Sequence, residues 1–231
     1  MNDPEREELL ELYADIRVAD VRDGLDAFGL HFQGSMSPSI RPLWRTRAVG
    51  IARTARYLPF DGVIPRLPPE EYWKWHRDYY KTVCSYPWSK EIEPGDFIVI
   101  DASGVSAGLM GSDNTMGCVR RGARGFVVNS GVRDTDEVIL QKVPFWSQII
   151  SQSVVQGRLR YDGHNIPVAV GGVTVHPGDV VVADGDGVVV VPRALARGVI
   201  EQARQIHKDD RAARRRHYEA LGLALDDTVR D

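Results

Sequence analysis

Short apolar runs alternate with helical stretches from residue 93 onward, and this pattern constrains the fold more than any other feature of the sequence. Continuous apolar runs of a few residues are typical of strands buried on both faces. We expect strands at residues 46–58, 97–100, 125–129, 144–150, 166–170, 173–175, 179–183 and 187–191, and helices at 5–28 (in two pieces), 69–84, 113–121, 134–142 and 193–220. Strands outnumber helices and some follow one another directly, unlike the strict alternation of Rossmann and TIM folds. The pattern therefore predicts a compact α/β domain with two sheet layers or a barrel-like sheet flanked by helices.

The tripeptide Pro-Gly-Asp occurs twice, at 94–96 and 177–179, each time directly before an apolar run. Pro-Gly is a turn signal, so each copy leads the chain into a buried strand. Two similar turns are enough to explain the repeat. A second interpretation is that two sheet layers are entered in the same way.

Residues 59–92 form an insertion-like segment that is rich in proline and aromatic residues. It contains Pro59, Pro65, Pro68, Pro69 and Pro87, together with Tyr72, Trp73, Trp75, Tyr79, Tyr80 and Trp88. Pro69 is well placed at the start of a helix. The aromatic side chains could line a binding groove, but core packing or an oligomer contact is the favoured interpretation.

Charge and cysteine content exclude several functional classes. The chain has 29 Lys and Arg against 32 Asp and Glu, a net charge of −3, and therefore no global field that attracts nucleic acid or an anionic membrane. No apolar run approaches the ~20 residues that span a bilayer, and the acidic stretch 1–5 does not resemble a signal peptide. Cys84 and Cys118 lack metal-site spacing. We expect a cytoplasmic protein without nucleic-acid or membrane partners.

Arg133-Asp134 is the most informative pair of polar residues. It follows a predicted strand and opens a predicted helix, and sites in α/β sheets form at the carboxyl ends of strands. An arginine there can fix a carboxylate or stabilise an oxyanion, and an aspartate can bind Mg²⁺ through oxygen. In the alternative interpretation, Asp134 caps the helix and Arg133 pairs with a surface acid.

The glycine-containing segment 108–114 is the second candidate, because it leads from a strand into a helix. Free backbone N–H groups at a helix N-terminus bind anions such as a substrate carboxylate, and Asp113 could hold a metal-bound water. A simple loop with Ser112 or Asp113 as helix cap is the alternative. The segment is not G-x-G-x-x-G, which argues against dinucleotide binding.

Other familiar catalytic patterns are missing from the sequence. Only five residues are lysines, and none lies in a glycine-rich or strand-end setting, which disfavours Schiff-base chemistry. The six histidines lack the spacing of a zinc site, and neither G-x-S-x-G nor a Walker loop occurs. The run 184–187, Asp-Gly-Asp-Gly, is more typical of a hairpin turn than of a metal loop.

Residues 111–134, which end in Gly131-Val132-Arg133-Asp134, resemble the signature of the RraA-like family. The resemblance also covers 19–25, 171–175, 177–179 and 184–188. The family includes the HMG/CHA aldolases, which cleave 4-hydroxy-4-methyl-2-oxoglutarate and 4-carboxy-4-hydroxy-2-oxoadipate to pyruvate and a second oxo acid. Family-like sequence lies on both sides of the aromatic segment, so we expect residues 1–231 to form a single domain.

The resemblance implies a layered α/β/β/α fold of the swivelling β/β/α type with a long C-terminal helix. It also implies a homotrimer or homohexamer with sites between subunits. Mg²⁺ (or Mn²⁺) would be held by Asp134, and Arg133 would bind the oxygen that becomes the pyruvate enolate. Backbone amides at Gly111, Ser112, Asp113 and Asn114 would hold the pyruvyl carboxylate. An acid of the C-terminal helix, Asp209 or Asp210, would reach a neighbouring subunit.

One departure from the family motif bears on the chemistry. The motif has an acid directly after the glycine, 21 positions before the arginine, whereas this chain has Ser112 there and its acid, Asp113, one position later. We expect a divalent-metal-dependent C–C lyase that cleaves a 4-hydroxy-2-oxo acid and also decarboxylates oxaloacetate. The alternatives are a non-catalytic ribonuclease regulator of the RraA type, and a lyase or decarboxylase for a sugar-derived oxo acid.

Overall fold

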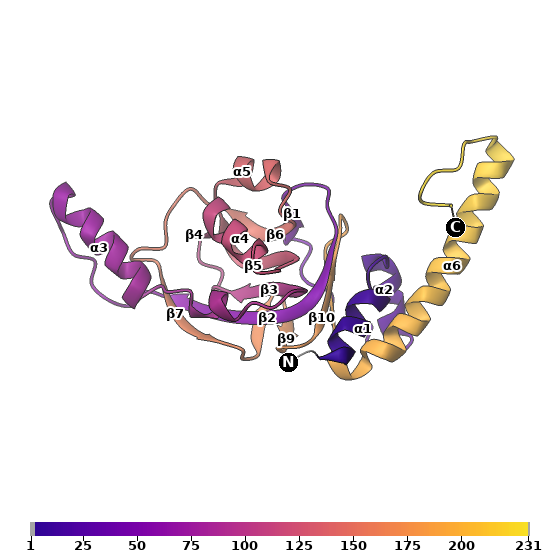
Figure 1. Cartoon of the computed structure of the whole chain (residues 1–231), viewed down its shortest axis with the longest axis horizontal. Coiled ribbons are helices and arrows are strands. Elements are labelled where there is room, and N and C mark those ends of the chain that lie inside the picture. Colours follow the sequence, from indigo (N-terminus) through magenta and orange to yellow (C-terminus); the bar gives the residue numbers. More distant parts are fainter. Residues whose placement is uncertain (1–2, 231) are drawn as a thin grey trace.

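The computed structural model describes residues 3–230 and has a mixed α/β fold built on one curled sheet (Figure 1). The helices are α1 (Pro4–Leu12), α2 (Val18–Asp26), α3 (Pro69–Thr82), α4 (Ser112–Val119), α5 (Thr135–Leu140) and α6 (Ala196–Leu221), with short 3₁₀ helices η1 (Pro87–Glu91) and η2 (Arg193–Leu195). The strands are β1 (Arg41–Pro42), β2 (Ala48–Pro59), β3 (Asp96–Asp101), β4 (Gly108–Met110), β5 (Gly125–Val132), β6 (Phe145–Ile150), β7 (Leu159–His164), β8 (Val168–Val170), β9 (Val173–Val175), β10 (Val180–Ala183) and β11 (Val188–Val191). The predicted α/β class with a long C-terminal helix is confirmed.

The long strand β2 organises the sheet. It pairs with β3 in parallel and with β10 and β7 antiparallel, in the order β1-β6-β5-β3-β2-β10-β11, with β4 added on β5. Strands β8 and β9 form a separate two-stranded sheet. Because β2 is twelve residues long and strongly curled, its two ends contribute to different parts of the core.

The two Pro-Gly-Asp turns have the same construction. Gly95 and Gly178 both adopt φ +93°, a backbone conformation that glycine adopts freely. The aspartate that follows closes each turn, because Asp96 accepts from Glu93 N at 2.9 Å and Asp179 accepts from His176 N at 2.8 Å. The turns lead into β3 and β10, which flank β2 in one sheet. They therefore do not enter two separate layers.

Three clusters of buried apolar side chains hold the elements together. One joins α1, α2 and the first turns of α6 to β2, β10 and β11. A second lies under α3, α4 and α5 and includes Trp88, Phe126 and Phe145. The third lies between the main sheet and the β8–β9 sheet. Helices therefore cover the sheet at two different places, and the candidate site residues belong to the α4–α5 side.

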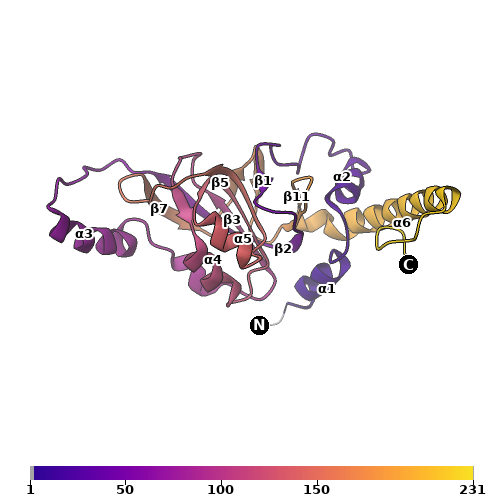
Figure 2. The same cartoon turned by 90° about the horizontal axis from the view of Figure 1, so that it is seen from above.

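Helices α3 and α6 project from opposite ends of the body (Figure 2). In α6 only Ala196, Val199, Ile200 and Ala203 are buried, so its arginine-rich remainder extends past the sheet. Within residues 3–230, no helix combines the length and the apolar character that crossing a membrane requires.

Strand β7 was missing from the sequence prediction because it is mostly polar. Its residues Arg160, Tyr161 and Asp162 are only partly buried or exposed, and Gly163 interrupts the run. The strand pairs with the far end of β2 through a bulge between Arg56 and Tyr57. The backbone partner, and not burial of an apolar face, makes this segment a strand.

Candidate active site

Two parallel strands bring the predicted site residues together. Strand β4 ends at Met110 and β5 ends at Val132, and the two pair in parallel, so that their carboxyl ends meet at one edge. The Arg133 amide donates to the Met110 carbonyl at 3.0 Å. The loop at Gly111 and the Arg133-Asp134 pair, separate candidates in the sequence, therefore form one site.

Asp134 lies across the N-terminus of α4. Its Oδ2 accepts from the backbone N of Ser112 at 3.1 Å and lies 3.3 Å from the Ser112 hydroxyl. The side chain makes no capping bond to α5, which excludes the simple cap interpretation. Asp134 adopts the left-handed backbone conformation (φ 52°, ψ 42°). This conformation is uncommon outside glycine, although Asp tolerates it better than most residues, and such strained positions cluster at functional sites.

Glycines give the Asp134 and Arg133 side chains room to approach the loop. A Cβ at Gly111 would lie 2.4 Å from Asp134 Oδ2, and one at Gly108 would lie 2.9 Å from Arg133 Cβ. Both distances are far below ordinary contact, so a side chain at either position would displace the site. The glycines are needed here for close approach and not for backbone freedom.

The pair opens into a cavity of about 390 Å³. Its lining comes from four segments and consists of His76, Tyr80, Tyr86, Gly108, Leu109, Gly111, Asp113, Asn114, Arg133 and Asp134. The Arg133 and Asp134 side chains are each 35% exposed, and Arg133 Nε lies 3.5 Å from Asp134 Oδ1. A guanidinium, two carboxylates and helix-end amides thus face a space large enough for a small oxo acid.

The aromatic segment contributes directly to this cavity. Tyr79 and Trp88 are buried in the core, as the favoured interpretation expected, whereas Tyr80 and Tyr86 line the cavity. The Tyr86 hydroxyl donates to the Leu109 carbonyl at 2.7 Å and ties the segment to β4. Trp73 stays 58% exposed. The segment therefore serves partly as core and partly as the wall of the site.

His76 and Tyr86 line the cavity, and neither was singled out from the sequence. His76 is the one whose titration bears on the chemistry. It lies one helical turn before Tyr80 on α3, and that i,i+4 spacing was the available signal. Its half-buried ring lies against Tyr72, Trp73 and Tyr80, with ring centroids 5.3–5.9 Å away. Burial first, and then the nearby Arg133 charge, lower the pKa of His76 below its usual value, so the ring is neutral at pH 7. A neutral imidazole beside Arg133 can accept a proton.

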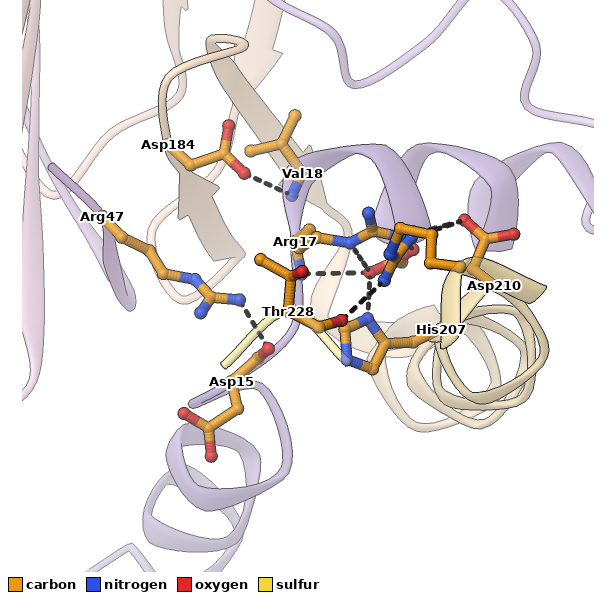
Figure 3. Close-up of polar contacts among 10 residues, drawn as sticks. Asp15, Arg17, Val18, Arg47, Asp184, His207, Asp210 and Thr228 are labelled. Atoms are coloured by element: carbon orange, nitrogen blue, oxygen red, sulfur yellow. Dashed lines mark hydrogen bonds and ion pairs between the residues drawn. The ribbon is translucent and has the colours of Figure 1, made fainter. Parts of the chain in front are cut away.

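The remaining predicted residues lie in different places. Asp113 and Asn114, on the first turn of α4, line the cavity. Asp209 and Asp210 are on α6: Asp209 accepts from Gln205 at 3.0 Å, and Asp210 pairs with Arg17 at 3.0 Å (Figure 3). Neither lines the cavity of its own chain. Their predicted reach into a neighbouring subunit stays a prediction.

The carboxylates fit a hard cation that keeps most of its water ligands. Within residues 3–230, no three His, Cys, Asp or Glu side chains converge as metal ligands, which disfavours a closed zinc-type cage. Mg²⁺ commonly binds one or two carboxylates, waters and substrate oxygens. Asp134 and Asp113 both line this cavity and supply such a donor set.

Cysteine chemistry is excluded at this site. Cys84 and Cys118 are both free and buried. Burial raises the pKa of each thiol to about 12, so neither is a thiolate at neutral pH. Both side chains pack in the core beneath α3 and α4.

Comparison with known proteins identifies relatives. The RraA-like family model, described as Aldolase/RraA, matches residues 18–190. A protein of Halalkalibacterium halodurans named "Putative 4-hydroxy-4-methyl-2-oxoglutarate aldolase" is 33% identical over 127 residues, 54% of this chain and 60% of that protein. Protein DlpA of Legionella pneumophila is 26% identical over 196 residues, 84% of this chain and 29% of that protein. This chain thus aligns with less than two-thirds of the length of either relative.

Two solved structures resemble nearly the whole chain. An uncharacterized protein from Pseudomonas syringae pv. tomato has a TM-score of 0.74 at 26% identity, covering 96% of both chains. Streptomyces coelicolor RraAS2, described as an unusual member of the RNase ES inhibitor RraA protein family, has a TM-score of 0.71 at 28% identity, covering 90% of this chain and 96% of that one. Together with the family model that spans most of the sequence, these matches lead to the conclusion that the chain belongs to the RraA-like family.

Proposed function

We propose that this protein is a divalent-metal-dependent C–C lyase that cleaves a 4-hydroxy-2-oxo acid to pyruvate and a second oxo acid. The observation that carries the proposal is the contact of Asp134 with the N-terminus of α4, beside Arg133 and at the mouth of a cavity. Relatives named as 4-hydroxy-4-methyl-2-oxoglutarate aldolases support this reaction class.

Arg133 supplies the charge that the reaction needs. Cleavage of the C3–C4 bond leaves an electron pair that becomes the pyruvate enolate, with negative charge on the C2 oxygen. A guanidinium hydrogen-bonded to that oxygen stabilises the enolate more than the neutral ketone, and this difference accelerates the reaction. The same enolate forms when oxaloacetate loses CO₂, so the site would also decarboxylate oxaloacetate.

His76 supplies the base in this proposal. The C4 hydroxyl must lose its proton as the bond breaks and the C4 carbonyl forms, and the enolate must then take up one proton at C3 to become pyruvate. Ser112 stands where the family motif has an acid, and a serine hydroxyl is a poor base at neutral pH. His76 lines the same cavity, and its lowered pKa keeps the ring in the proton-accepting form.

Asp134 would hold the metal directly, and Asp113 would hold it through water. A bound Mg²⁺ or Mn²⁺ would polarise the 2-oxo acid as a Lewis acid. The backbone N–H groups of Asp113 and Asn114 at the start of α4 would bind the C1 carboxylate, since the Ser112 N–H already donates to Asp134. Because other groups would bind the metal and the C1 carboxylate, Arg133 is free to bind the C2 oxygen.

The test is release of pyruvate from 4-hydroxy-4-methyl-2-oxoglutarate and from oxaloacetate, coupled to lactate dehydrogenase. We expect activity with Mg²⁺, none after exhaustive chelation, and recovery when Mg²⁺ is restored. Arg133→Lys should lower kcat strongly, because a single ammonium does not reproduce the guanidinium geometry. Asp61→Asn, in an exposed loop away from the cavity, is the matched surface control. Full activity in the presence of chelator would contradict the proposal.

A second candidate function is ribonuclease regulation without chemistry. It is favoured by the similarity to Streptomyces coelicolor RraAS2, a member of an RNase ES inhibitor family. Stable capture of an RNase E-type enzyme by the purified protein, with inhibition of that enzyme and no turnover of any oxo acid, would establish this function in place of the lyase. The reverse pattern would exclude it.

We also propose a homotrimer or homohexamer in the cytoplasm. Helix α6, which carries Asp209 and Asp210, projects from the body of the molecule, where a neighbouring copy could contact it (Figure 2). Light scattering coupled to size exclusion measures the mass directly. A monomer at working concentration would contradict the assembly.

A further inference from the structure

A second cavity, of about 710 Å³, lies at the α6 end of the molecule and shares no residue with the candidate active site. It is lined by Asp15, Arg17, Arg47, His207, Arg211, Arg214, Asp227, Thr228 and Arg230. Figure 3 labels five of these residues, Asp15, Arg17, Arg47, His207 and Thr228. Five arginines and a histidine thus face one space with two aspartates, in a chain whose net charge is −3.

A buried acid fixes one wall of this cavity. The side chain of Asp20 is 1% exposed, and it accepts from Arg17 Nε at 2.8 Å and pairs with His207 Nδ1 at 2.7 Å. Burial alone would raise the pKa of Asp20, but the hydrogen bonds from Arg17 and His207 lower it, so the carboxylate stays charged. Since Nδ1 of His207 is bound to Asp20, Nε2 remains available on a side chain that lines the cavity.

The C-terminal segment closes another side. Val229 is buried, and Asp226 accepts from the Tyr218 hydroxyl at 2.8 Å, which folds the segment back along α6. The Thr228 carbonyl accepts from Arg214 at 3.4 Å. The cavity is therefore formed by four segments of the chain, two near its N-terminal end and two near its C-terminal end.

Two of these arginines form no ion pair with any residue between 3 and 230. Within that range Arg47 donates only to the backbone carbonyl of Asp15, whose carboxylate points away from it in Figure 3. Arg211 is half-buried and has no hydrogen bond or ion pair with any residue between 3 and 230. Arg17 and Arg214, by contrast, share Asp210 at 3.0 and 3.5 Å. A half-buried guanidinium without an acceptor is stabilised when a bound anion accepts its hydrogen bonds.

We propose that this cavity is an oxyanion site that binds a phosphate-bearing small molecule. Guanidinium groups match phosphate oxygens in pairs, and Arg47 and Arg211 would bind them while His207 Nε2 adds a polar contact. The volume lies in the range of small-molecule sites. Asp15 and Asp227 line the same cavity, so positive charge covers only part of its wall, which favours a small anion over a long polyanion such as RNA.

Calorimetric titration of the full chain tests this directly, with inorganic phosphate and glycerol phosphate as probes. We expect saturable binding of at least one probe, and the probe that binds more tightly should also raise the Tm more. The difference between the two affinities tells whether the site prefers free phosphate or a phosphate ester. Arg211→Gln should weaken binding by about tenfold or more, because one charge-assisted contact is lost. Arg216→Gln, an exposed arginine on α6 outside the cavity, should bind as the wild type does.

Three results would overturn the proposal. The first is the lack of saturable binding of either probe by the wild-type chain. The second is equal binding by the Arg211→Gln and Arg216→Gln variants, each shown by its unfolding transition to be folded. The third is binding of an oligoribonucleotide that excess phosphate does not displace and that Arg211→Gln does not weaken.

Discussion

Replacing Gly111 by alanine should separate Asp134 from the N-terminus of α4 without unfolding the protein. The new Cβ would lie 2.4 Å from Asp134 Oδ2, whereas ordinary contact begins near 3.4 Å, so the oxygen must retreat by about 1 Å. The 3.1 Å bond from Ser112 N is then lost. A hydrogen bond to a charged acceptor is worth about 1.5–3 kcal/mol. We therefore expect kcat/KM for pyruvate release to fall by about tenfold to a hundredfold.

The fold itself should tolerate this change, since Gly111 has φ −138° and ψ −174°, which any residue adopts. Gly117→Ala is the matched control, because its Cβ on the same helix meets only Arg121 Nη1 at 3.8 Å. That variant should keep its activity and gain up to about 1 kcal/mol of helix stability. Wild-type kcat/KM in Gly111→Ala would refute the role of the Asp134–Ser112 contact. So would an equal loss of activity in Gly117→Ala.

Two further predictions concern titratable groups. Asp20→Asn should lower the free energy of unfolding in urea by about 2–3 kcal/mol, below the usual ~3–5 for a fully buried pair because Arg17 is one-third exposed. The lowered pKa of Asp20 means that its contribution holds above about pH 4 and is lost as pH falls through the folded pKa; Asp20→Asn should therefore flatten the acid limb of the stability curve. The lowered pKa of His76 keeps the base form at pH 7, so kcat/KM should fall only below about pH 6.5. His76→Gln should lower kcat/KM about a hundredfold and abolish its fall at acidic pH. An unchanged dependence of kcat/KM on pH would exclude His76 as the base.

Local sequence patterns were sufficient to predict most of the elements. Continuous apolar runs predict β3, β5, β10 and β11, because these strands are buried on both faces and need no alternation. The strand β4 is only three residues long, and β7 is largely polar, so neither carries such a signal. Both exist because a neighbouring strand supplies their hydrogen bonds.

The site could be predicted only in parts. Strand-end logic indicated Arg133-Asp134, and the glycine loop indicated Ser112 and its neighbours, but nothing local says that Asp134 accepts from an amide 22 positions earlier. That contact follows from the parallel pairing of β4 with β5. The position of His76 at the cavity depends on contacts between segments that are even farther apart in the sequence. Helix α3 is positioned through the Tyr79 hydroxyl, which donates to the Leu159 carbonyl at 2.8 Å, a relation between segments 80 residues apart.

We propose that Asp134 and a divalent metal together give this protein its oxo-acid lyase activity. The most direct measurement is the initial rate of pyruvate release by wild type and Asp134→Asn over a Mg²⁺ titration that starts from metal-free protein. We expect a saturable Mg²⁺ dependence in the wild type. We expect the variant to be inactive at every Mg²⁺ concentration and to unfold as the wild type does. Pyruvate release that is independent of Mg²⁺, or undiminished in Asp134→Asn, would contradict this proposal.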